Sequence, residues 1–271
     1  MPIGSQLVQI AGSTVLVTGA SGGLGEAIAR ELRGRGASLA LTARRREALE
    51  TLAAELQARA LAADLADRVQ LEQLLDDAGQ IDALVANAGV PAAGRLESFS
   101  LAEVDRTLEV NLRAPVALAR ALLPGMLERR RGHLLFVSSI AGKTVVPGNP
   151  LYHATKYALR GFAAALRTDL HGSGVGVSCV FPGFIRDAGI FAESGVKLPP
   201  GVGTRSPEDV ARAVSRAIER DRGEVDVAPA FQRAGAIAAA LAPQDLAAAV
   251  VRRLGGVQIA EEMEGALRGK R

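Results

Sequence analysis

The sequence predicts an α/β fold built on a doubly wound parallel sheet, because two features run through most of the chain. First, short apolar runs alternate with longer segments of helical spacing between residues 14 and 227. Second, the apolar runs are hydrophobic at consecutive positions, which is typical of parallel strands covered on both faces and joined by helical crossovers. We therefore expect a seven-stranded parallel sheet with helices on both faces.

The individual strands and helices follow from this alternation in chain order. Strands are predicted at residues 14–18, 38–42, 58–63, 83–86, 133–137, 176–181 and 224–227, of which 58–63 is the weakest. Helices are predicted between them at residues 23–34, 47–57, 68–78, 101–127, 151–171 and 207–220. The start of the last helix is the best marked, because Ser206 can cap it and Pro207 suits its first position.

The pattern changes after Val227, where no further strand is predicted. Residues 230–268 form short Ala-rich helical segments separated by Pro243 and by Gly255-Gly256. We interpret residues 1–228 as one domain and residues 229–271 as a helical appendage of the same domain. The appendage has three possible roles: packing on the domain, contacting a second subunit, or resting on a membrane surface. The first two are favoured.

Composition excludes several classes of protein. In 271 residues, 48% of them hydrophobic, there is enough apolar material for one core, and the single cysteine, Cys179, allows no internal disulfide or metal cluster. A net charge of +3 without tryptophan argues against nucleic acid binding. The apolar stretch 234–242 is far shorter than the roughly 20 residues of a membrane-spanning helix. We expect no cleaved leader, no metal and a cytoplasmic location.

A glycine-rich turn follows the first predicted strand and reads Thr-Gly-Ala-Ser-Gly-Gly-Leu-Gly at residues 18–25. Glycines allow a tight turn and let backbone amides approach a pyrophosphate, which the positive end of the next helix stabilises. An ordinary flexible turn is the alternative, but a sheet of this class has its nucleotide crevice at this point. The candidate phosphate-binding residues are Gly19, Ser21, Gly22, Gly23, Leu24 and Gly25.

Three arginines follow the second predicted strand, at residues 44–46. In a dinucleotide site this region faces the adenosine ribose, where a carboxylate suits NAD and an arginine fork suits the 2′-phosphate of NADP. No acidic residue lies between Ala37 and Arg46. We therefore predict NADP (NADPH) rather than NAD, with Arg44 and Arg45 as the binding residues. Solvated arginines at a helix start are the alternative, chiefly for Arg45 and Arg46.

A tyrosine and a lysine open the predicted helix at 151–171. Tyr152 and Lys156 are four residues apart and share a helix face on which we identify no packing role. A nearby ammonium favours the phenolate and brings its pKa, ordinarily about 10, closer to neutral. Ser138 and Ser139 end the preceding strand, where a hydroxyl can bind a substrate oxygen. Coincidental spacing and an ordinary serine turn are the alternatives.

With these motifs the chain resembles the short-chain dehydrogenase/reductase superfamily over roughly residues 10–228. The matching motifs, in the family's order, are residues 18–25, Asp64, Asn87-Ala88-Gly89, Asn111, Ser139, Tyr152 with Lys156, and Pro182-Gly183. The resemblance implies a Rossmann fold and an enzyme that transfers a hydride between a nicotinamide cofactor and a carbonyl or alcohol.

The resemblance also implies roles for the matched residues. Tyr152 would be the general acid/base, Lys156 would lower its pKa and bind the nicotinamide ribose, and Ser139 would polarise the carbonyl. Asn111 would hold a water that relays protons to Lys156. Cofactor contacts are implied at Asp64, Leu65, Asn87, Ala88, Gly89, Tyr152, Lys156, Pro182, Gly183 and Ile185.

Asn111 has support from the sequence itself. Pro115 lies four residues later and has no N–H to donate to the Asn111 carbonyl, which leaves that carbonyl free for water. A proline that merely kinks a long helix is the alternative.

Two positions depart from the family's pattern. Many members have a threonine where this chain has Asp187, and a carboxylate near cofactor phosphates would be unfavourable unless it is paired, with Arg186 as the adjacent candidate. NADP users often have a basic residue where Gly22 stands, so the cofactor prediction depends on the arginines at 44–46.

These observations predict an NADP-dependent oxidoreductase that interconverts a ketone or aldehyde and an alcohol, with Tyr152 as general acid/base. A catalytically silent NADP-binding sensor or scaffold, which contacts a partner through its C-terminal extension, is the alternative. The apolar segment 184–204 should cover the substrate, so we expect a hydrophobic ketone or secondary alcohol, although these residues could instead pack on the scaffold. By resemblance, the helices at 101–127 and 151–171 would pair subunits into a homodimer or homotetramer.

Overall fold

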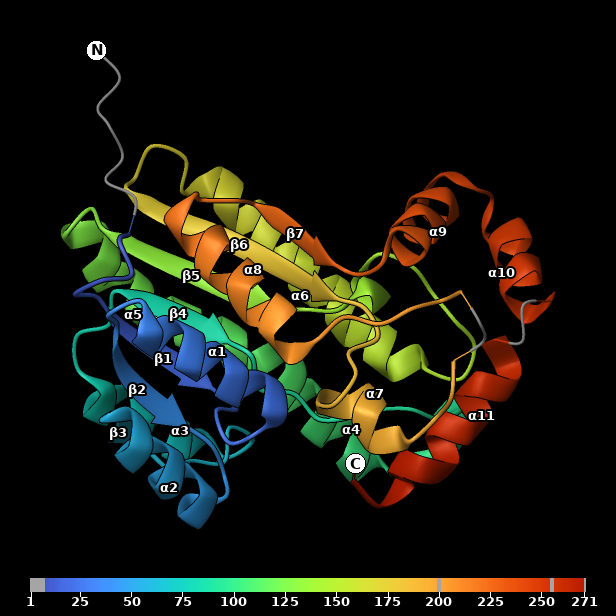
Figure 1. The fold of residues 1–271 in the computed structure, drawn as a ribbon, viewed down its shortest axis with the longest axis horizontal. Coiled ribbons are helices and arrows are strands. Elements are labelled where there is room, and N and C mark those ends of the chain that lie inside the picture. Colours follow the sequence, from blue (N-terminus) through green and yellow to red (C-terminus); the bar gives the residue numbers. More distant parts are fainter. Residues whose placement is uncertain (1–7, 199–200, 254–255, 271) are drawn as a thin grey trace.

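The centre of the protein is a sheet of seven parallel strands, in a computed structural model that describes residues 8–198, 201–253 and 256–270. The strand order is β3-β2-β1-β4-β5-β6-β7 (Figure 1). The strands are β1 Thr14–Thr18, β2 Ser38–Thr42, β3 Arg59–Ala60, β4 Ala83–Ala86, β5 Gly132–Val137, β6 Val175–Pro182 and β7 Glu224–Val227. The predicted Rossmann-type sheet is confirmed.

Helices cover both faces of this sheet. One face carries α1 Gly23–Gly34, α2 Arg46–Leu56 and α8 Pro207–Glu219. The other carries α3 Arg68–Ala78, α5 Ala114–Glu128 and α6 Pro150–Asp169. Two shorter helices, α4 Leu101–Leu108 and α7 Gly189–Ser194, precede α5 and α8. The predicted C-terminal helical extension consists of α9 Ala230–Leu241, α10 Gln244–Arg253 and α11 Gly256–Leu267, and the expected glycine break at Gly255 lies outside the described residues.

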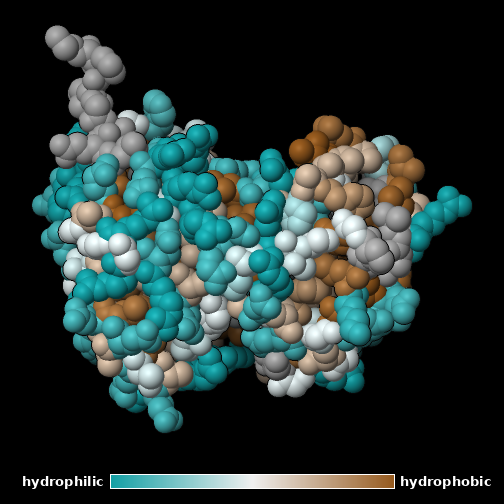
Figure 2. All heavy atoms as spheres, viewed as in Figure 1, coloured by the Kyte–Doolittle hydropathy of each residue, from teal (hydrophilic) through white to brown (hydrophobic). Residues whose placement is uncertain are grey.

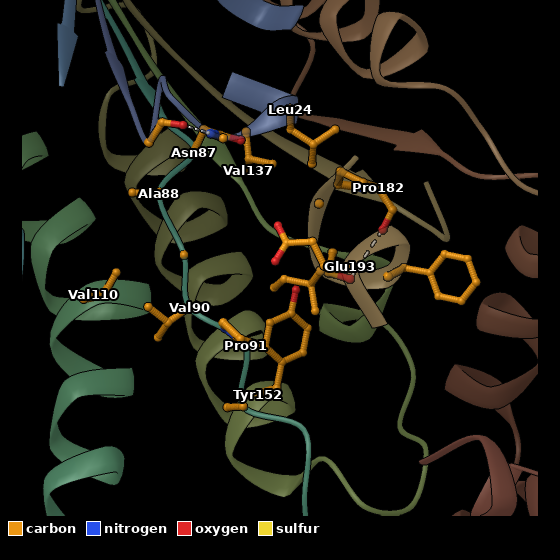
Figure 3. A pocket seen from close by; sticks show the side chains of 18 of the residues that line it. Leu24, Asn87, Ala88, Val90, Pro91, Val110, Val137, Tyr152, Pro182 and Glu193 are labelled. Atoms are coloured by element: carbon orange, nitrogen blue, oxygen red, sulfur yellow. Dashed lines mark hydrogen bonds between the residues drawn. The ribbon is translucent and has the colours of Figure 1, made fainter. Parts of the chain in front are cut away.

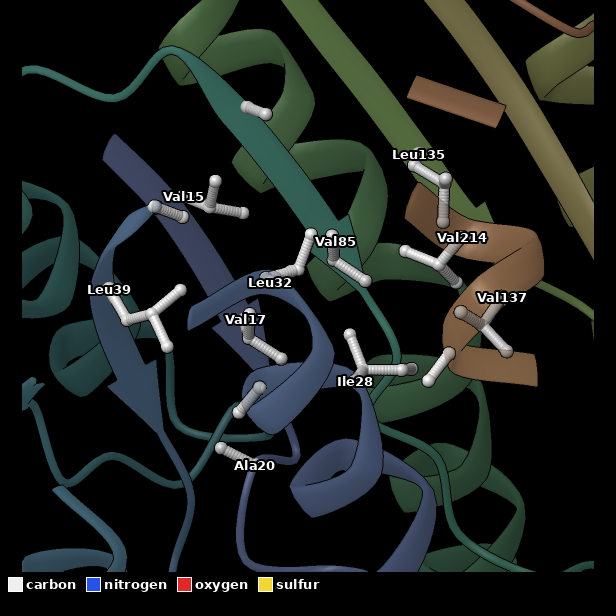
Figure 4. Close-up of a cluster of buried hydrophobic side chains, with 14 of the residues drawn as sticks. Val15, Val17, Ala20, Ile28, Leu32, Leu39, Val85, Leu135, Val137 and Val214 are labelled. Carbon is white, nitrogen blue, oxygen red and sulfur yellow. The ribbon is translucent and has the colours of Figure 1, made fainter. Parts of the chain in front are cut away.

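Two apolar cores form because successive side chains of a strand point to opposite faces. Val15 and Val17 of β1 belong to the core beneath α1, α2 and α8, whereas Leu16 belongs to the core on the other face. Figure 4 shows the first core, in which Ile28 of α1 and Val214 of α8 pack above the strands. This packing fixes α1 against the sheet, with its N-terminus at the carboxyl ends of the strands.

The chain changes direction across the sheet between β1 and β4. It runs outward from β1 to β2 and β3, then returns to β4 beside β1 and continues outward through β5, β6 and β7. The loops that follow β1 and β4 therefore lead to helices on opposite faces and leave a crevice between them. Sheets of this kind bind their ligands at such a crevice.

The helix predicted at 101–127 is interrupted in its middle. After α4 ends at Leu108, a π turn occupies Glu109–Arg113, and the N–H of Ala114 donates to the Glu109 carbonyl five residues back. Pro115 gives a physical reason, because it cannot donate to the Asn111 carbonyl in α-helical register. The wider turn lets the helix continue past this missing donor.

Two further elements differ from expectation. β3 has two residues instead of the predicted 58–63. The N–H groups of Leu61 and Ala63 nevertheless donate to the carbonyls of Leu41 in β2 and of Ala43 just after it, at 2.9 and 3.2 Å. Its side chains are exposed, so burial adds little to this edge strand. In addition, α7 lies within the segment 184–204, for which no helix was predicted and of which residues 199–200 lie outside the described residues.

The surface of α9 and α10 is more apolar than its surroundings. Figure 2 shows hydrophobic residues gathered over these helices at the upper right. The exposed large side chains there are Phe231, Ile237, Leu241, Leu246 and Val250. In the part of the chain that the structure describes, we find no helix with both the length and the apolar character needed to cross a bilayer.

Buried His133 predicts a loss of stability in mild acid. Its ring lies in the core on β5, with Nε2 2.8 Å from the Ser178 hydroxyl, and burial lowers its pKa to about 4 from 6.5. The folded protein therefore resists protonation that the unfolded chain accepts. The stability that neutral His133 supports is fully present above pH 6.5 and falls by about 3 kcal/mol as the pH drops to 4.

Urea unfolding near neutral pH and near the lowered pKa, on wild type and His133→Gln, measures this effect. Glutamine does not titrate, so we expect the variant to lose less stability than wild type on acidification. Equal losses in the two proteins would assign the acid sensitivity to other groups.

Candidate active site

A cavity of about 720 Å³ opens at the carboxyl ends of the strands, where β1 and β4 diverge. Its volume is within the range of small-molecule and cofactor sites. All of the predicted site residues line it except Asn111. Figure 3 shows several of its side chains, including Leu24 from the start of α1, Asn87 and Val90 after β4, and Tyr152 from α6.

The glycine-rich turn forms one end of this cavity. Gly19 has a φ of +66°, and a Cβ at this position would lie 2.8 Å from the Cα of Ala88, so the backbones of the β1 and β4 loops touch. Gly22 caps α1 without any side-chain hydrogen bond to its first turn, and Gly22–Gly25 line the cavity. Free N–H groups at a helix N-terminus attract anions. The residues present therefore fit a dinucleotide pyrophosphate.

The arginines after β2 lie at the same end. Arg44 and Arg45 line the cavity, and the guanidinium of Arg45 donates to the Ser21 carbonyl at 2.6 Å. Arg46 instead begins α2 and pairs with Glu50 at 3.4 Å. Of the three arginines, Arg44 and Arg45 therefore line the cavity and Arg46 does not.

Asp64 lines the cavity beside a residue that the sequence did not reveal. Arg106 of α4 donates to both carboxylate oxygens of Asp64, at 3.0 and 3.4 Å, and the Ala66 N–H donates to one of them. Burial raises the pKa of this carboxyl, but these hydrogen bonds outweigh burial, so its pKa is lowered. The Asp64 side chain that lines the cavity is therefore ionised and held in place by these hydrogen bonds.

The Asn87-Ala88-Gly89 segment is fixed to the ends of its neighbours. The Thr18 hydroxyl accepts from the N–H groups of Asn87 and Ala88, both at 3.0 Å, and the Asn87 amide donates to the Thr18 carbonyl at 3.1 Å. These bonds join β1 to the β4 loop and hold one wall of the cavity.

Asn111 lies behind this wall rather than in it. Its side chain accepts from the Val90 N–H at 2.8 Å and donates to the Val90 carbonyl at 3.0 Å. It is 1% exposed, so both amide atoms are committed to the loop. Gly89 adjoins both Asn111 and Lys156, since a Cβ there would lie 3.4 Å from Asn111 Oδ1 and 3.9 Å from Lys156 Nζ.

Tyr152, Lys156 and Ser139 meet in the cavity, as predicted. The Ser139 hydroxyl lines the cavity with the Tyr152 phenol and donates to the Pro182 carbonyl at 3.4 Å; Figure 3 shows Tyr152 and Pro182 in the cavity. Lys156 Nζ donates to the Val137 carbonyl at 3.1 Å and lies 5.6 Å from the centre of the Tyr152 ring. Ser138 instead donates to the Lys156 carbonyl at 3.0 Å, which makes Ser139 the better substrate contact.

The expected lowering of the Tyr152 pKa by Lys156 is not met in this arrangement. Burial raises the pKa of Tyr152 to about 12, although the nearby Ser139 hydroxyl opposes that rise. Burial also lowers the pKa of Lys156 to about 8. With a pKa of about 8, Lys156 is still mostly charged at neutral pH, but burial of the phenol outweighs any support that this charge gives to the phenolate. Tyr152 is therefore a protonated phenol at neutral pH.

His153, which sequence analysis did not single out, holds the loop that carries Ser139. Its Nε2 accepts from the Val146 N–H at 3.1 Å, so the ring proton is on Nδ1 and is donated to the Ala141 carbonyl at 2.8 Å. Burial lowers the pKa of this imidazole, which keeps it neutral. The histidine next to Tyr152 thus ties α6 to the loop after β5.

The segment after β6 covers the cavity. Its aromatic side chains Phe184 and Phe191 contact each other with ring centres 4.7 Å apart, and both line the cavity with Glu193 of α7. Asp187 does not intrude, because it is 74% exposed and pairs with Arg186 at 3.4 Å, as expected. Its φ of +67° turns the chain at this point. The segment thus passes the site with the Asp187 carboxylate exposed to solvent.

Residues 13–196 match the family model for short chain dehydrogenases. The ketoacyl reductase HetN of Nostoc sp. is 37% identical over 230 residues, which cover 82% of this chain and 80% of HetN.

Two solved structures have similar folds and carry different cofactors. A short-chain dehydrogenase from Sphingobium yanoikuyae in complex with NADPH has a TM-score of 0.74 at 28% identity, covering 86% of this chain and 94% of that one. A 3-oxoacyl-[acyl-carrier protein] reductase from Brucella melitensis with bound NAD has a TM-score of 0.72 at 32% identity, covering 81% and 90%.

The contact between the β1 and β4 loops predicts that Gly19→Ala damages the site. A methyl group there meets Ala88 and demands a left-handed backbone, which costs about 1–2 kcal/mol before any clash is counted. We expect a lower melting temperature and at least roughly 10-fold weaker NADPH binding, measured by fluorescence titration. Gly34→Ala is the matched control, because a Cβ at Gly34 has nothing within 4 Å. If both variants bind NADPH like wild type, the turn does not hold the cofactor.

Proposed function

The chain belongs to the short-chain dehydrogenase family of NAD(P)-dependent enzymes acting on CH–OH or C=O groups, and we propose that it uses NADPH to reduce a ketone or aldehyde to an alcohol. The observation that carries this proposal is the meeting of Tyr152, Ser139 and Lys156 in a cavity whose other end has an uncapped helix N-terminus and two arginines. Residues 1–228 would form the cofactor-binding and catalytic domain, and residues 229–271 its appendage.

The reaction that we propose needs a proton on the substrate oxygen. When bound, a reduced nicotinamide would supply the hydride for the substrate carbon. Tyr152 would donate its proton to the oxygen, and its raised pKa supports this role because the phenol keeps its proton at neutral pH. The Ser139 hydroxyl, which lines the cavity together with the phenol, would hold the same oxygen in line. A protonated phenol is the form of Tyr152 that the reduction direction requires.

Lys156 and Asn111 would support Tyr152 in different ways. With a pKa of about 8, Lys156 can lose and regain a proton near neutral pH, which suits the return of a proton to Tyr152 after each turnover. The Asn111 side chain would position the Val90 loop. Its carbonyl, to which Pro115 cannot donate, would hold the proposed water.

The cofactor preference rests on Arg44 and Arg45. NADPH and NAD occur among the similar structures, so the family alone does not choose between them. Two guanidinium groups with no carboxylate between Ala37 and Arg46 favour a 2′-phosphate over free ribose hydroxyls. The proposed cofactor is therefore NADPH, with NAD as the weaker ligand.

The substrate that we propose is an apolar carbonyl compound. Around Tyr152 the cavity is lined by Val90, Val146, Phe184, Ile190 and Phe191. Such walls favour a hydrophobic substituent on the carbonyl carbon. The similarity to HetN makes ketoacyl compounds the first candidates to test.

We further propose a homodimer or homotetramer that forms through α4, α5 and α6. These helices expose Leu101, Leu108, Leu127 and Tyr157 in the single chain. Burying such side chains against a second copy is favourable.

Replacing Tyr152 with phenylalanine should abolish most of the turnover. The variant loses the proton donor and keeps the ring, so we expect NADPH oxidation with a panel of ketones to slow by about 10²–10⁴-fold, while NADPH affinity is little changed. Tyr157→Phe is the matched control, because it removes the chain's other phenol, which is exposed on the same helix. Equal turnover in wild type and Tyr152→Phe would refute the mechanism.

Removing both arginines should change the cofactor preference. In Arg44→Ala/Arg45→Ala we expect the NADPH dissociation constant to rise by roughly 10–100-fold and that of NADH to change little, because only NADPH carries the phosphate that these residues would bind. Arg46→Ala, which removes a neighbouring cation paired with Glu50, serves as the control. A parallel loss of both cofactors would point to a general effect on folding.

A further inference from the structure

The last helix of the C-terminal extension is packed differently from the two before it. α9 and α10 carry most of the exposed apolar side chains of the extension, whereas α11 buries Ala260 and Leu267, which are 5% and 0% exposed. In Figure 1, α11 lies beside α7, on the side of the molecule away from α2. α11 is thus docked on the domain at the end opposite the arginines of the ribose site.

The docking contacts of α11 lie next to the reactive residues. A Cβ on Gly148 would lie 2.6 Å from the Cβ of Ala260, so this glycine admits the helix just four residues before Tyr152. The N–H of Arg95 donates to the Glu264 carboxylate at 3.3 Å, and the Gly94 N–H donates to the Gly148 carbonyl at 2.7 Å. α11 therefore rests on two loops that are themselves bonded together.

One face of this docked helix reaches the cavity. Met263 of α11 and Gly269 just after it line the same cavity as Tyr152, Phe184 and Phe191. Met263 is half-buried and lies three residues after Ala260 and four before Leu267, so the three side chains share one helix face. The face of α11 that packs on the domain therefore also faces the cavity.

We propose that α11 is a wall of the substrate compartment and that Met263 sets the size of the apolar group that the substrate carries. This inference rests on the proposed carbonyl reduction. The aromatic pair Phe184 and Phe191 would form the facing wall, contributed by the segment before and within α7. A carbonyl held at Tyr152 would therefore direct its larger apolar substituent between α7 and α11.

The side chain at 263 suits this role for a physical reason. Methionine is unbranched and flexible, so it adapts to apolar groups of different shape. A rigid, larger side chain would shorten the compartment, and a smaller one would lengthen it. Because Arg44 and Arg45 lie at the other end of the cavity, neither change should disturb cofactor binding.

The first experiment compares kcat/KM for methyl ketones of increasing chain length in the full-length protein. Met263→Trp should lower kcat/KM for the longest ketones by roughly 10-fold or more and leave the shortest nearly unchanged, whereas Met263→Ala should shift the optimum to longer chains. Val257→Ala is the control, because Val257 is exposed on the same helix and does not line the cavity. An unchanged chain-length profile in both Met263 variants, with unaltered melting and NADPH affinity, would overturn the proposal.

The second experiment does not depend on catalysis. Met263→Cys is treated with a maleimide, against a low background because Cys179, the only native cysteine, is buried. We expect a long-chain methyl ketone with NADPH to slow labelling by about 5-fold or more, and labelling of Val257→Cys to be unaffected. If the ketone slows labelling of Met263→Cys but wild type does not reduce it, carbonyl reduction is refuted and the role of α11 as a wall of the substrate compartment still holds. If wild type reduces the ketone but the ketone does not slow labelling of Met263→Cys, only the role of α11 as a wall is refuted.

Discussion

The site depends on one close approach, between the backbone of Gly19 and that of Ala88. A side chain at Gly19 would force apart the two loops that leave β1 and β4, since a Cβ there would lie 2.8 Å from Ala88 Cα. Thr18 and Asn87 then lock the contact with three hydrogen bonds. The first turn of α1, with no side-chain cap, and the wall that Asn111 supports are both positioned by this contact.

Much of the fold could be predicted because the chain's local signals agree with its tertiary environment. α1 and β1 have the predicted bounds, since a glycine turn and a run of buried aliphatic residues leave few alternatives. The π turn that interrupts the helix expected at 101–127 was not predicted, because hydrophobic periodicity does not show how the helix continues past Pro115. The length of β3 and the presence of α7 were not predicted, because contacts with neighbouring segments determine where an edge strand ends and whether a short surface helix forms.

The candidate site divides in the same way. Tyr152, Ser139 and the glycine turn belong to local motifs, and the structure brings them into one cavity. Met263 of α11 lines the cavity, and Arg106 of α4 donates to Asp64, which lines it. Both residues lie outside the motifs, and no spacing in the sequence connects them to the site. The pKa of Tyr152 was also beyond prediction, because the desolvation that raises it depends on how deeply the phenol is buried.

The π turn at Glu109–Arg113 has a geometric consequence for the charge at the rim of the site. Each residue of an α-helix advances the chain by about 100° around the axis, so one extra residue in a turn rotates everything before it relative to everything after it. α5 can therefore keep its apolar side on the sheet while α4 presents Arg106 to Asp64. A straight helix through the same span would aim that guanidinium elsewhere and leave Asp64 without the hydrogen bonds from Arg106.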